Sequence, residues 1–147
     1  MDASSILPVL AMDIQKGDNI LDICASPGGK TLVMLQTMLP GTITCRDIKA
    51  GRIERLKRTL KSYINVDDLD RLVKVEFNTQ KFGLKAEEEI FDKVLVDVPC
   101  TNDRKSLNIE DNNIFSRKRI DERTEIPEKQ AELLRYVFNE YLKNLNL

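Results

Sequence analysis

Apolar and polar positions follow two different periods along the chain. Short, nearly continuous apolar runs, typical of buried parallel strands, occur at residues 19–24, 42–46, 71–77 and 93–97. Between and after these runs, apolar residues recur at helical spacing, which predicts helices at residues 6–12, 30–38, 51–63 and 130–142. Strands that alternate with helices indicate a parallel sheet with helices on its faces. The sequence therefore predicts an α/β fold.

Two prolines and the point where the alternation of strands and helices stops set the expected limits of the domain. Pro8 is expected in the first turn of the first helix, and Pro127 at the start of the last. A polar loop is expected over residues 101–125, just before that last helix. Four strands are few for a doubly wound sheet, and the last helix would normally lead into a fifth. We therefore expect one incomplete domain, residues 1–147.

Composition and charge exclude several classes of protein. With 41% hydrophobic and 32% charged residues, the 147-residue chain can bury a core, which argues against disorder. Its 23 basic and 24 acidic residues give a net charge of -1, so any nucleic-acid contact must be local or supplied from elsewhere. No apolar run has the length of a membrane span. The N-terminal segment has no basic leader, so we expect neither a secretory signal nor a transit peptide.

Cysteine and histidine usage bears on metal binding. The three cysteines, Cys24, Cys45 and Cys100, are too few and too far apart for a disulfide framework or a zinc knuckle. The chain has no histidine, the commonest protein ligand for metals. We therefore expect a reduced protein without a metal site.

The segment after the first predicted strand contains a glycine turn. Gly28 and Gly29 allow the backbone to approach a ligand, and the next helix, which begins near Lys30, presents free N–H groups to an anion. A P-loop is excluded because Cys24 stands where its first glycine would be, and the dinucleotide fingerprint is absent. Two interpretations remain, a nucleotide-type ligand loop and an ordinary strand-to-helix turn.

A carboxylate follows the second predicted strand. Asp47 stands about twenty residues after the glycines, where such a group accepts hydrogen bonds from ribose hydroxyls. An aspartate at that place can equally cap a helix. Arg52, one helical turn further on, either helps to hold a ligand or belongs to a solvated helix face. Together with the glycine turn, Asp47 favours the ligand interpretation.

The end of the fourth predicted strand carries a second set of polar groups. Asp97 and Cys100 lie there around Pro99, which restrains the strand exit. A cysteine at such an edge can act as a nucleophile or base if a positive neighbour lowers its pKa, and otherwise it is a small packing residue. Cys24 and Cys45 are expected within strands, as packing residues.

In combination, these motifs resemble the Sun-domain family of RNA cytosine-5 methyltransferases. The matching segments are DICASPGGKT (residues 22–31), Asp47 with Arg52, and DVPCT (residues 97–101). NDRKSL and EDNNIF, within residues 102–115, resemble the branch that acts on mitochondrial ribosomal RNA. The resemblance covers essentially the whole chain. It implies a Rossmann-like class I methyltransferase fold, a mitochondrial location, a ribosomal RNA substrate and a helical-repeat partner of the mitochondrial termination-factor type.

The resemblance also implies a site for S-adenosylmethionine. The residues concerned are Gly28, Gly29, Lys30, Asp47, Arg52, Asn78 and Asp97. The glycines and the lysine would line the methionine end, and Asp47 would hold the ribose with Arg52 close by. Asn78 replaces the family's usual aspartate near the adenine. Asp97 would sit beside the target cytosine and the methyl group, and Cys100 would assist release of the methylated product.

Catalysis in this family needs a further cysteine. Its thiolate adds to C6 of cytosine, C5 then takes the methyl group, and loss of the C5 proton lets the thiolate leave. That cysteine belongs to a Thr-Cys motif after the fifth strand, which the chain does not reach. We therefore expect this chain to be truncated and inactive alone, with an open edge on its fourth strand. The alternative is a non-catalytic fragment that binds the cofactor or a partner.

The predicted long loop contains basic residues interleaved with acids. Its balanced charge suits a solvated surface, whereas its length and its position after Cys100 suit a substrate contact. We predict the second, with Arg117, Lys118 and Arg119 as contacts to RNA phosphates.

Overall fold

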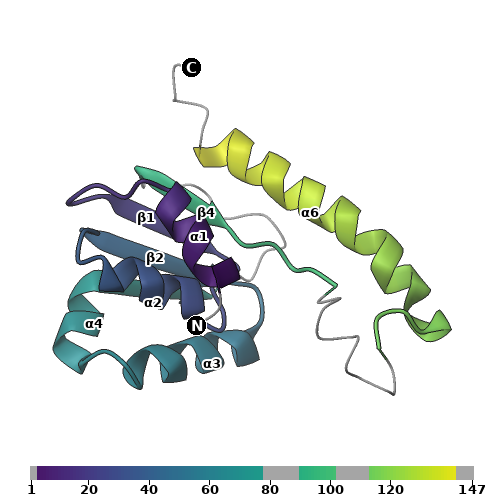
Figure 1. Ribbon diagram of the computed structural model, residues 1–147, viewed down its shortest axis with the longest axis horizontal. Coiled ribbons are helices and arrows are strands. Elements are labelled where there is room, and N and C mark those ends of the chain that lie inside the picture. Colours follow the sequence, from purple (N-terminus) through teal and green to yellow (C-terminus); the bar gives the residue numbers. More distant parts are fainter. Residues whose placement is uncertain (1–2, 78–89, 102–112, 142–147) are drawn as a thin grey trace. The chain divides into compact units, whose positions relative to one another are not determined.

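The computed structural model describes residues 3–77, 90–101 and 113–141 (Figure 1). Residues 1–97 form one compact unit and residues 98–147 form a second.

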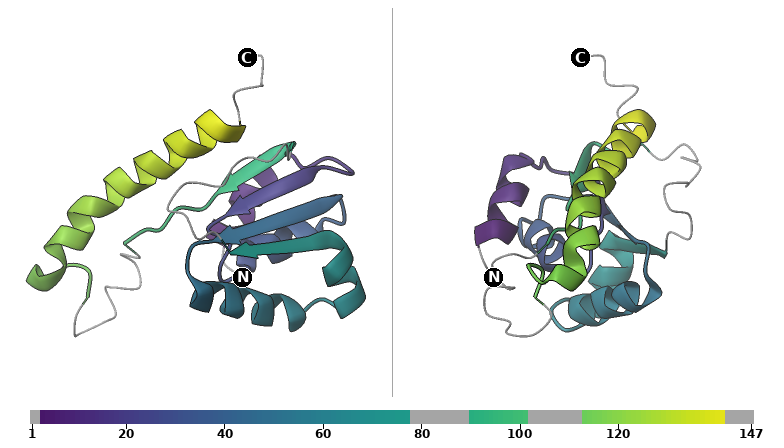
Figure 2. Two further views of the ribbon diagram at one scale, coloured as in Figure 1. Left: turned by 180° about the vertical axis from the view of Figure 1, so that it is seen from behind. Right: turned by 90° about the vertical axis from the view of Figure 1, so that its right-hand side faces the viewer.

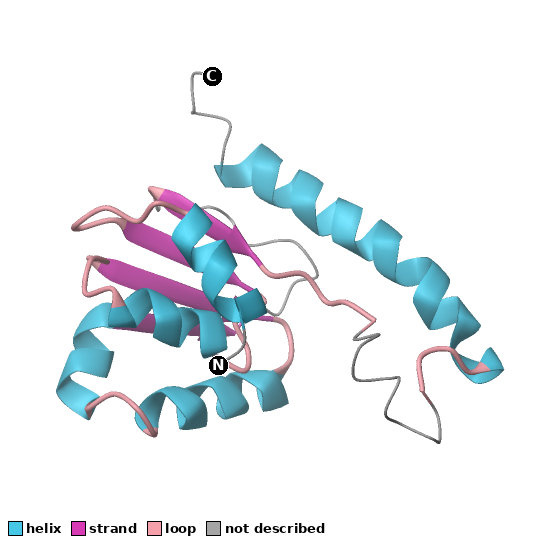
Figure 3. Ribbon diagram, in the orientation of Figure 1, coloured by secondary structure: helices cyan, strands magenta, loops and turns pink. Residues whose placement is uncertain are grey.

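The first unit is built on a parallel sheet of four strands (Figure 3). The strands are β1 (Asn19–Ile23), β2 (Thr42–Asp47), β3 (Val73–Phe77) and β4 (Lys93–Val96). Their order is β3-β2-β1-β4, so β4 pairs with β1 and the strand order reverses there. In sheets of this type, ligands bind beyond the carboxyl ends of the strands where the order reverses. The α/β prediction and its four strands are confirmed, and the ligand edge is expected next to β1 and β4.

In the described part of the first unit, four helices accompany this sheet. They are α1 (Ala3–Ala11), α2 (Gly29–Gln36), α3 (Ala50–Lys61) and α4 (Val66–Leu72). Seen from behind, the strands lie in front of α1 and α2 (Figure 2). Among the described residues, no helix is long and apolar enough to cross a membrane.

Helix α4 corrects the expected bounds of the third strand. We predicted a strand over residues 71–77, but Arg71 and Leu72 end α4, and β3 begins only at Val73. The helix starts at an Asn65 cap, whose side chain accepts a hydrogen bond from the Asp68 N–H at 2.8 Å. Only one residue of this short helix is buried, which leaves no helical period for the apolar pattern to reveal.

The core lies between the sheet and the helices α2 and α3. Ile20 and Ile43 are paired partners on adjacent strands, and both are completely buried. Met34 of α2 and Leu56 and Leu60 of α3 pack into the same cluster and are also fully buried. This packing fixes the helices at the ends of β1 and β2, where the polar residues of the predicted site lie.

The described residues of the second unit form a 3-10 turn, η1 (Arg117–Arg119), and a long helix, α6 (Ile120–Tyr141). The predicted loop over residues 101–125 is therefore wrong from residue 117 onward, and the last helix begins at Ile120, before the start expected near Pro127. Pro127 lies inside α6 instead of at its start. Asp121 and Glu122 occupy the first turn, where acidic side chains stabilise the positive end of a helix dipole.

Candidate cofactor site

The turn between β1 and α2 is shaped around Gly28. This residue precedes α2 with a φ of 102°, in the left-handed region that favours glycine. Its N–H donates to the carbonyl of Ala25 at 2.8 Å, which closes the turn. A Cβ at Gly28 would lie only 2.8 Å from Cδ1 of Leu56. The first N–H groups of α2 have no partners within the helix, so they can receive a carboxylate.

Asp47 ends β2 as a nearly buried carboxylate that is held from two sides. Arg52 Nε donates to Asp47 Oδ2 at 2.8 Å, and the Lys49 N–H lies 3.3 Å from Oδ1. A second Arg52 nitrogen, Nη2, donates to the carbonyl of Ser26 at 2.8 Å. Arg52 therefore ties the acid after β2 to the turn after β1. The Arg52 side chain is 40% exposed, but these two bonds hold it at the strand ends, so it is more than a residue of a solvated helix face.

Asp47 is also not the cap of the following helix. The residue that caps α3 is Lys49, which makes no side-chain capping bond. With one strong bond to Oδ2 and one long contact to Oδ1, the Asp47 carboxylate keeps acceptor capacity for further hydroxyl donors.

Lys30 and Asp97 form an ion pair at the carboxyl edge of the sheet, beside β1 and β4, where the strand order reverses. Lys30 Nζ, in the first turn of α2, lies 2.8 Å from Asp97 Oδ2, which follows β4. The Asp97 N–H donates to the carbonyl of Ile23 at 3.3 Å, which continues the pairing of β4 with β1. Because the Asp97 side chain is 47% exposed, this ion pair adds little stability and leaves the carboxylate accessible.

A buried carboxylate, Asp22, lies beneath this edge. Thr31 donates its hydroxyl to Asp22 Oδ2 at 2.7 Å and also contacts the sulfur of Cys45 at 3.6 Å. The other oxygen, Oδ1, is buried and has no hydrogen-bond partner within the described part of the chain. Burial raises the pKa of Asp22 to about 7, against the effect of the Thr31 hydrogen bond, and the nearby Asp97 raises it further. We did not predict a separate role for Asp22, although an acid inside a continuous apolar strand is a signal for one.

The raised pKa of Asp22 makes stability depend on pH. The folded-state pKa of Asp22 lies above the ordinary value of 3.8. The contribution of Asp22 to the free energy of unfolding is therefore fully present below pH 3.8 and is lost as pH rises through about 7. The full difference corresponds to about 4 kcal/mol. We expect urea unfolding to show lower stability at pH 8 than at pH 5, and a smaller pH dependence in Asp22→Asn. An unchanged pH dependence of stability in Asp22→Asn would contradict this prediction. The matched control is Asp67→Asn at an exposed position, which should keep the pH dependence of the parent chain.

The cysteines of the first unit are not poised for reaction. Burial and the charge of Asp47 raise the pKa of Cys24 to about 11. Cys24 does not lie within β1 as expected, because it follows the strand with a φ of 65°. Cys45 is the expected packing residue, completely buried in β2, and burial raises the pKa of its thiol. Thr44 and Cys45 form a Thr-Cys pair, but thiols that stay protonated at neutral pH are poor nucleophiles.

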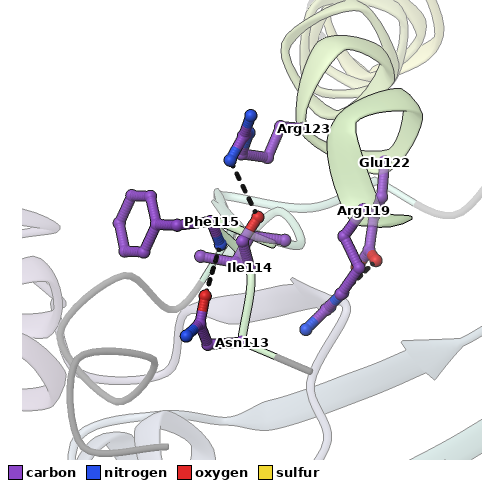
Figure 4. Close-up of polar contacts among 6 residues, drawn as sticks. All are labelled: Asn113, Ile114, Phe115, Arg119, Glu122 and Arg123. Carbon is purple, nitrogen blue, oxygen red and sulfur yellow. Dashed lines mark hydrogen bonds and ion pairs between the residues drawn. The ribbon is translucent and has the colours of Figure 1, made fainter. Parts of the chain in front are cut away.

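The remaining predicted residues lie in the second unit or outside the described residues. Cys100 is exposed, and Asn78 lies outside the described residues. In η1, Arg119 binds Glu122 through Nε and Nη2, both at 2.7 Å (Figure 4). Much of the charge of Arg119 is therefore balanced within the chain, whereas Arg117 and Lys118 are exposed. No group of acids and cysteines within the described ranges is arranged to hold a metal ion.

The fold is that of the class I S-adenosylmethionine-dependent methyltransferases. NSun6 from Pyrococcus horikoshii, whose structure was solved with SFG, superposes with a TM-score of 0.69 at 21% identity, over 93% of this chain and 33% of that chain. This likeness establishes the Rossmann-like fold of the class.

Sequence comparison gives the family. The chain belongs to the 16S rRNA methyltransferase RsmB/F family, whose model matches residues 9–144. It is 47% identical to the 5-cytosine rRNA methyltransferase NSUN4 of Bos taurus over 136 residues, 91% of this chain and 35% of that protein. It is 41% identical to the mitochondrial tRNA (cytosine(34)-C(5))-methyltransferase of Danio rerio, over 91% of this chain and 36% of that protein. The chain thus spans about a third of the length of these relatives.

Proposed function

We propose that this chain is the cofactor-binding part of an S-adenosylmethionine-dependent RNA cytosine-5 methyltransferase that acts on ribosomal RNA. The observation that carries the proposal is the convergence of the glycine turn, the Asp47–Arg52 pair and the Lys30–Asp97 pair at the carboxyl edge of the sheet. The 47% identity to an rRNA methyltransferase supports the same reaction.

The residues at this edge fit the chemical groups of the cofactor. Gly28 and Gly29 open α2, so its free N–H groups suit the methionine carboxylate. The acceptor capacity of Asp47 suits the two ribose hydroxyls, and Arg52 fixes the orientation of that carboxylate. When bound, S-adenosylmethionine supplies an activated methyl group. Lys30 holds Asp97 at the point where methyl donor and target base would meet.

Cysteine chemistry completes the proposal. Cys100 is exposed, so its thiol is accessible to a substrate, and we assign to it the release of the methylated product. Asp97 would bind the target cytosine beside the methyl group. The attacking thiolate would come from another cysteine, because neither Cys24 nor Cys45 is poised to ionise at neutral pH.

The finer assignment is to the small-subunit ribosomal RNA of mitochondria. The identity to NSUN4, and to a relative named as mitochondrial, supports it. A protein partner of the termination-factor type belongs to the same proposal and is supported by the resemblance in residues 102–115 alone.

Binding and turnover by this 147-residue chain test the proposal. We expect isothermal titration calorimetry to show binding of S-adenosylmethionine. Methyl transfer to small-subunit ribosomal RNA should be at background level, because burial keeps Cys24 and Cys45 protonated at neutral pH and Cys100 is assigned to product release. Cys100→Ser should bind the cofactor as the parent chain does. Absence of binding would contradict the proposed function, and measurable turnover would contradict the assignment of the cysteines.

A non-catalytic role is the second candidate, and the raised pKa values of Cys24 and Cys45 favour it for this polypeptide. The chain would then bind the cofactor or a partner without transferring a methyl group. Binding without turnover agrees with both candidates. Adding a separately expressed C-terminal region of NSUN4 would separate them, because restored turnover supports the enzymatic role alone.

A further inference from the structure

Helix α3 concentrates positive charge in a chain that is otherwise balanced. Its twelve residues include five basic side chains and one acidic one, a formal charge of +4, whereas the whole chain carries -1. One of the five, Arg52, is committed to Asp47. The other four form what we call the basic face: Arg55, Lys57, Arg58 and Lys61.

The basic face is exposed to solvent. The apolar residues Ile53, Leu56 and Leu60 turn the opposite side of α3 into the core, and they are at most 5% exposed. All four side chains of the basic face are exposed. Figure 1 shows α3 along the outer side of the first unit.

Within the described residues, the basic face has no acidic partners, whereas several cations elsewhere do. Arg46, Arg71, Lys74, Arg119 and Lys129 each form an ion pair with an acid. None of the four residues of the basic face pairs with an acid within the described residues, although Glu54 stands one turn before Arg58. What sets α3 apart is density: four exposed cations without an acidic partner among the described residues lie on one helix, which suits a negatively charged ligand.

The layout of these residues suits a single-stranded or looped nucleic acid. Arg55, Arg58 and Lys61 follow at intervals of three residues, so they form one row along the helix. Tyr63, just after α3, is 74% exposed, and an exposed aromatic ring of this kind stacks on unpaired bases. Arg52 lies at the edge of the proposed cofactor site. The row begins one helical turn after Arg52 and runs along α3 away from that site.

We propose that the basic face of α3 binds the phosphate backbone of the RNA substrate, with Tyr63 stacking on a base beside it. The identification of the polyanion as RNA rests on the proposed function. The cationic row and the exposed tyrosine favour RNA over an acidic protein, which would provide no base for Tyr63. In η1, Arg119 is balanced by Glu122, so α3 offers the denser unpaired charge.

A salt titration tests the surface. The probe is a labelled stem–loop RNA of mixed sequence, and the chain is compared with Arg55→Gln/Arg58→Gln. Removing two phosphate contacts should reduce the slope of log Kd against log salt by about 1.4–1.8 and weaken binding about tenfold at moderate salt. The matched control, Lys16→Gln/Arg135→Gln, removes two other exposed cations that form no ion pair with described residues, and should change Kd by less than about twofold. Equal losses in both variants, or no loss in either, would overturn the proposal.

Tyr63 gives a second, independent readout. Tyr63→Ala should weaken RNA binding at unchanged salt slope, because stacking releases no counterions, and Tyr63→Phe should restore it. Binding to phosphatidylserine vesicles in the absence of RNA binding would overturn the assignment to RNA. Glutamine is a good helix former, so α3 should persist in the double variant, which a thermal melt verifies.

Calorimetry separates failure of this inference from failure of the proposed function. Arg55 and Arg58 lie outside the Asp47–Arg52 pair, so the double variant should bind S-adenosylmethionine as the parent chain does. Absence of cofactor binding in the parent chain would refute the proposed function and leave the RNA result standing. Cofactor binding without a specific effect of Arg55→Gln/Arg58→Gln would refute the inference alone.

Discussion

Asp47→Ala is expected to weaken the binding of S-adenosylmethionine by about a hundredfold. The carboxylate is only 4% exposed, and its proposed bonds to the two ribose hydroxyls are charge-assisted. Bonds of this kind contribute about 1.5–3 kcal/mol each, and about 3 kcal/mol corresponds to the expected change in Kd. Isothermal titration calorimetry measures it directly.

Two further variants make the Asp47 experiment specific. Arg52→Gln keeps the Asp47 carboxylate but removes its 2.8 Å partner, so a smaller loss of affinity is expected. Asp67→Ala, on the exposed side of α4, removes the same charge far along the chain from the site and should bind normally. An Asp47→Ala protein that stays folded and binds within about threefold of the parent chain would refute the ribose role, since one such bond alone exceeds that change.

Gly28→Ala is the second large effect, this time on stability. An alanine there must adopt the left-handed φ of 102° and place its Cβ 2.8 Å from Leu56. Backbone strain and overpacking together should lower the free energy of unfolding by about 2–3 kcal/mol. The distorted turn should also weaken cofactor binding. Urea denaturation and calorimetry measure the two effects separately.

Gly51→Ala is the matched control for Gly28→Ala. Gly51 lies inside α3, and a Cβ there would meet no atom within 4 Å. The same change should therefore raise stability, by about 0.5–1 kcal/mol, because alanine has less conformational freedom in the unfolded chain. Similar effects at both glycines would show that Gly28 is not required by its turn.

The sequence predicted the sheet and the residues at its edge well, because parallel strands leave a strong local signal. Continuous apolar runs mark β1 and β4, and a parallel sheet must bring the ends of its strands together. Asp47 and Asp97 could thus be assigned to one edge from their positions alone. The order β3-β2-β1-β4 then places that edge at a reversal, as a doubly wound fold requires.

Elements that depend on caps and charges were predicted less well. Helix α4 buries one residue and depends on the Asn65 cap, so it carries no apolar period. The start of α6 was missed because Pro127 suggested a helix start, whereas the structure tolerates it inside the helix. Local propensity alone does not decide such cases, since packing and capping override it.

Side-chain contacts between distant residues account for the remaining differences between the sequence predictions and the structure. The choice between a solvated and a bound Arg52 was open in the sequence, because helical spacing does not show which neighbouring strand end is within reach. Ser26 and Asp47 supply its partners only after β1 and β2 have paired. The Asp22–Thr31 bond is likewise a tertiary contact, between a strand and the helix that follows it.

The pairing of β4 with β1 has a consequence for how the protein is made. Lys30 and Asp97 are 67 positions apart, so the ion pair between them closes a long loop. During synthesis, β1, β2 and β3 leave the ribosome before β4, and contacts of such long range are formed slowly. The ligand edge is therefore completed by the last of the four described strands to be synthesised. A ligand that binds only the completed edge stabilises the chain at that step, by about 2.7 kcal/mol at a hundredfold excess over its Kd.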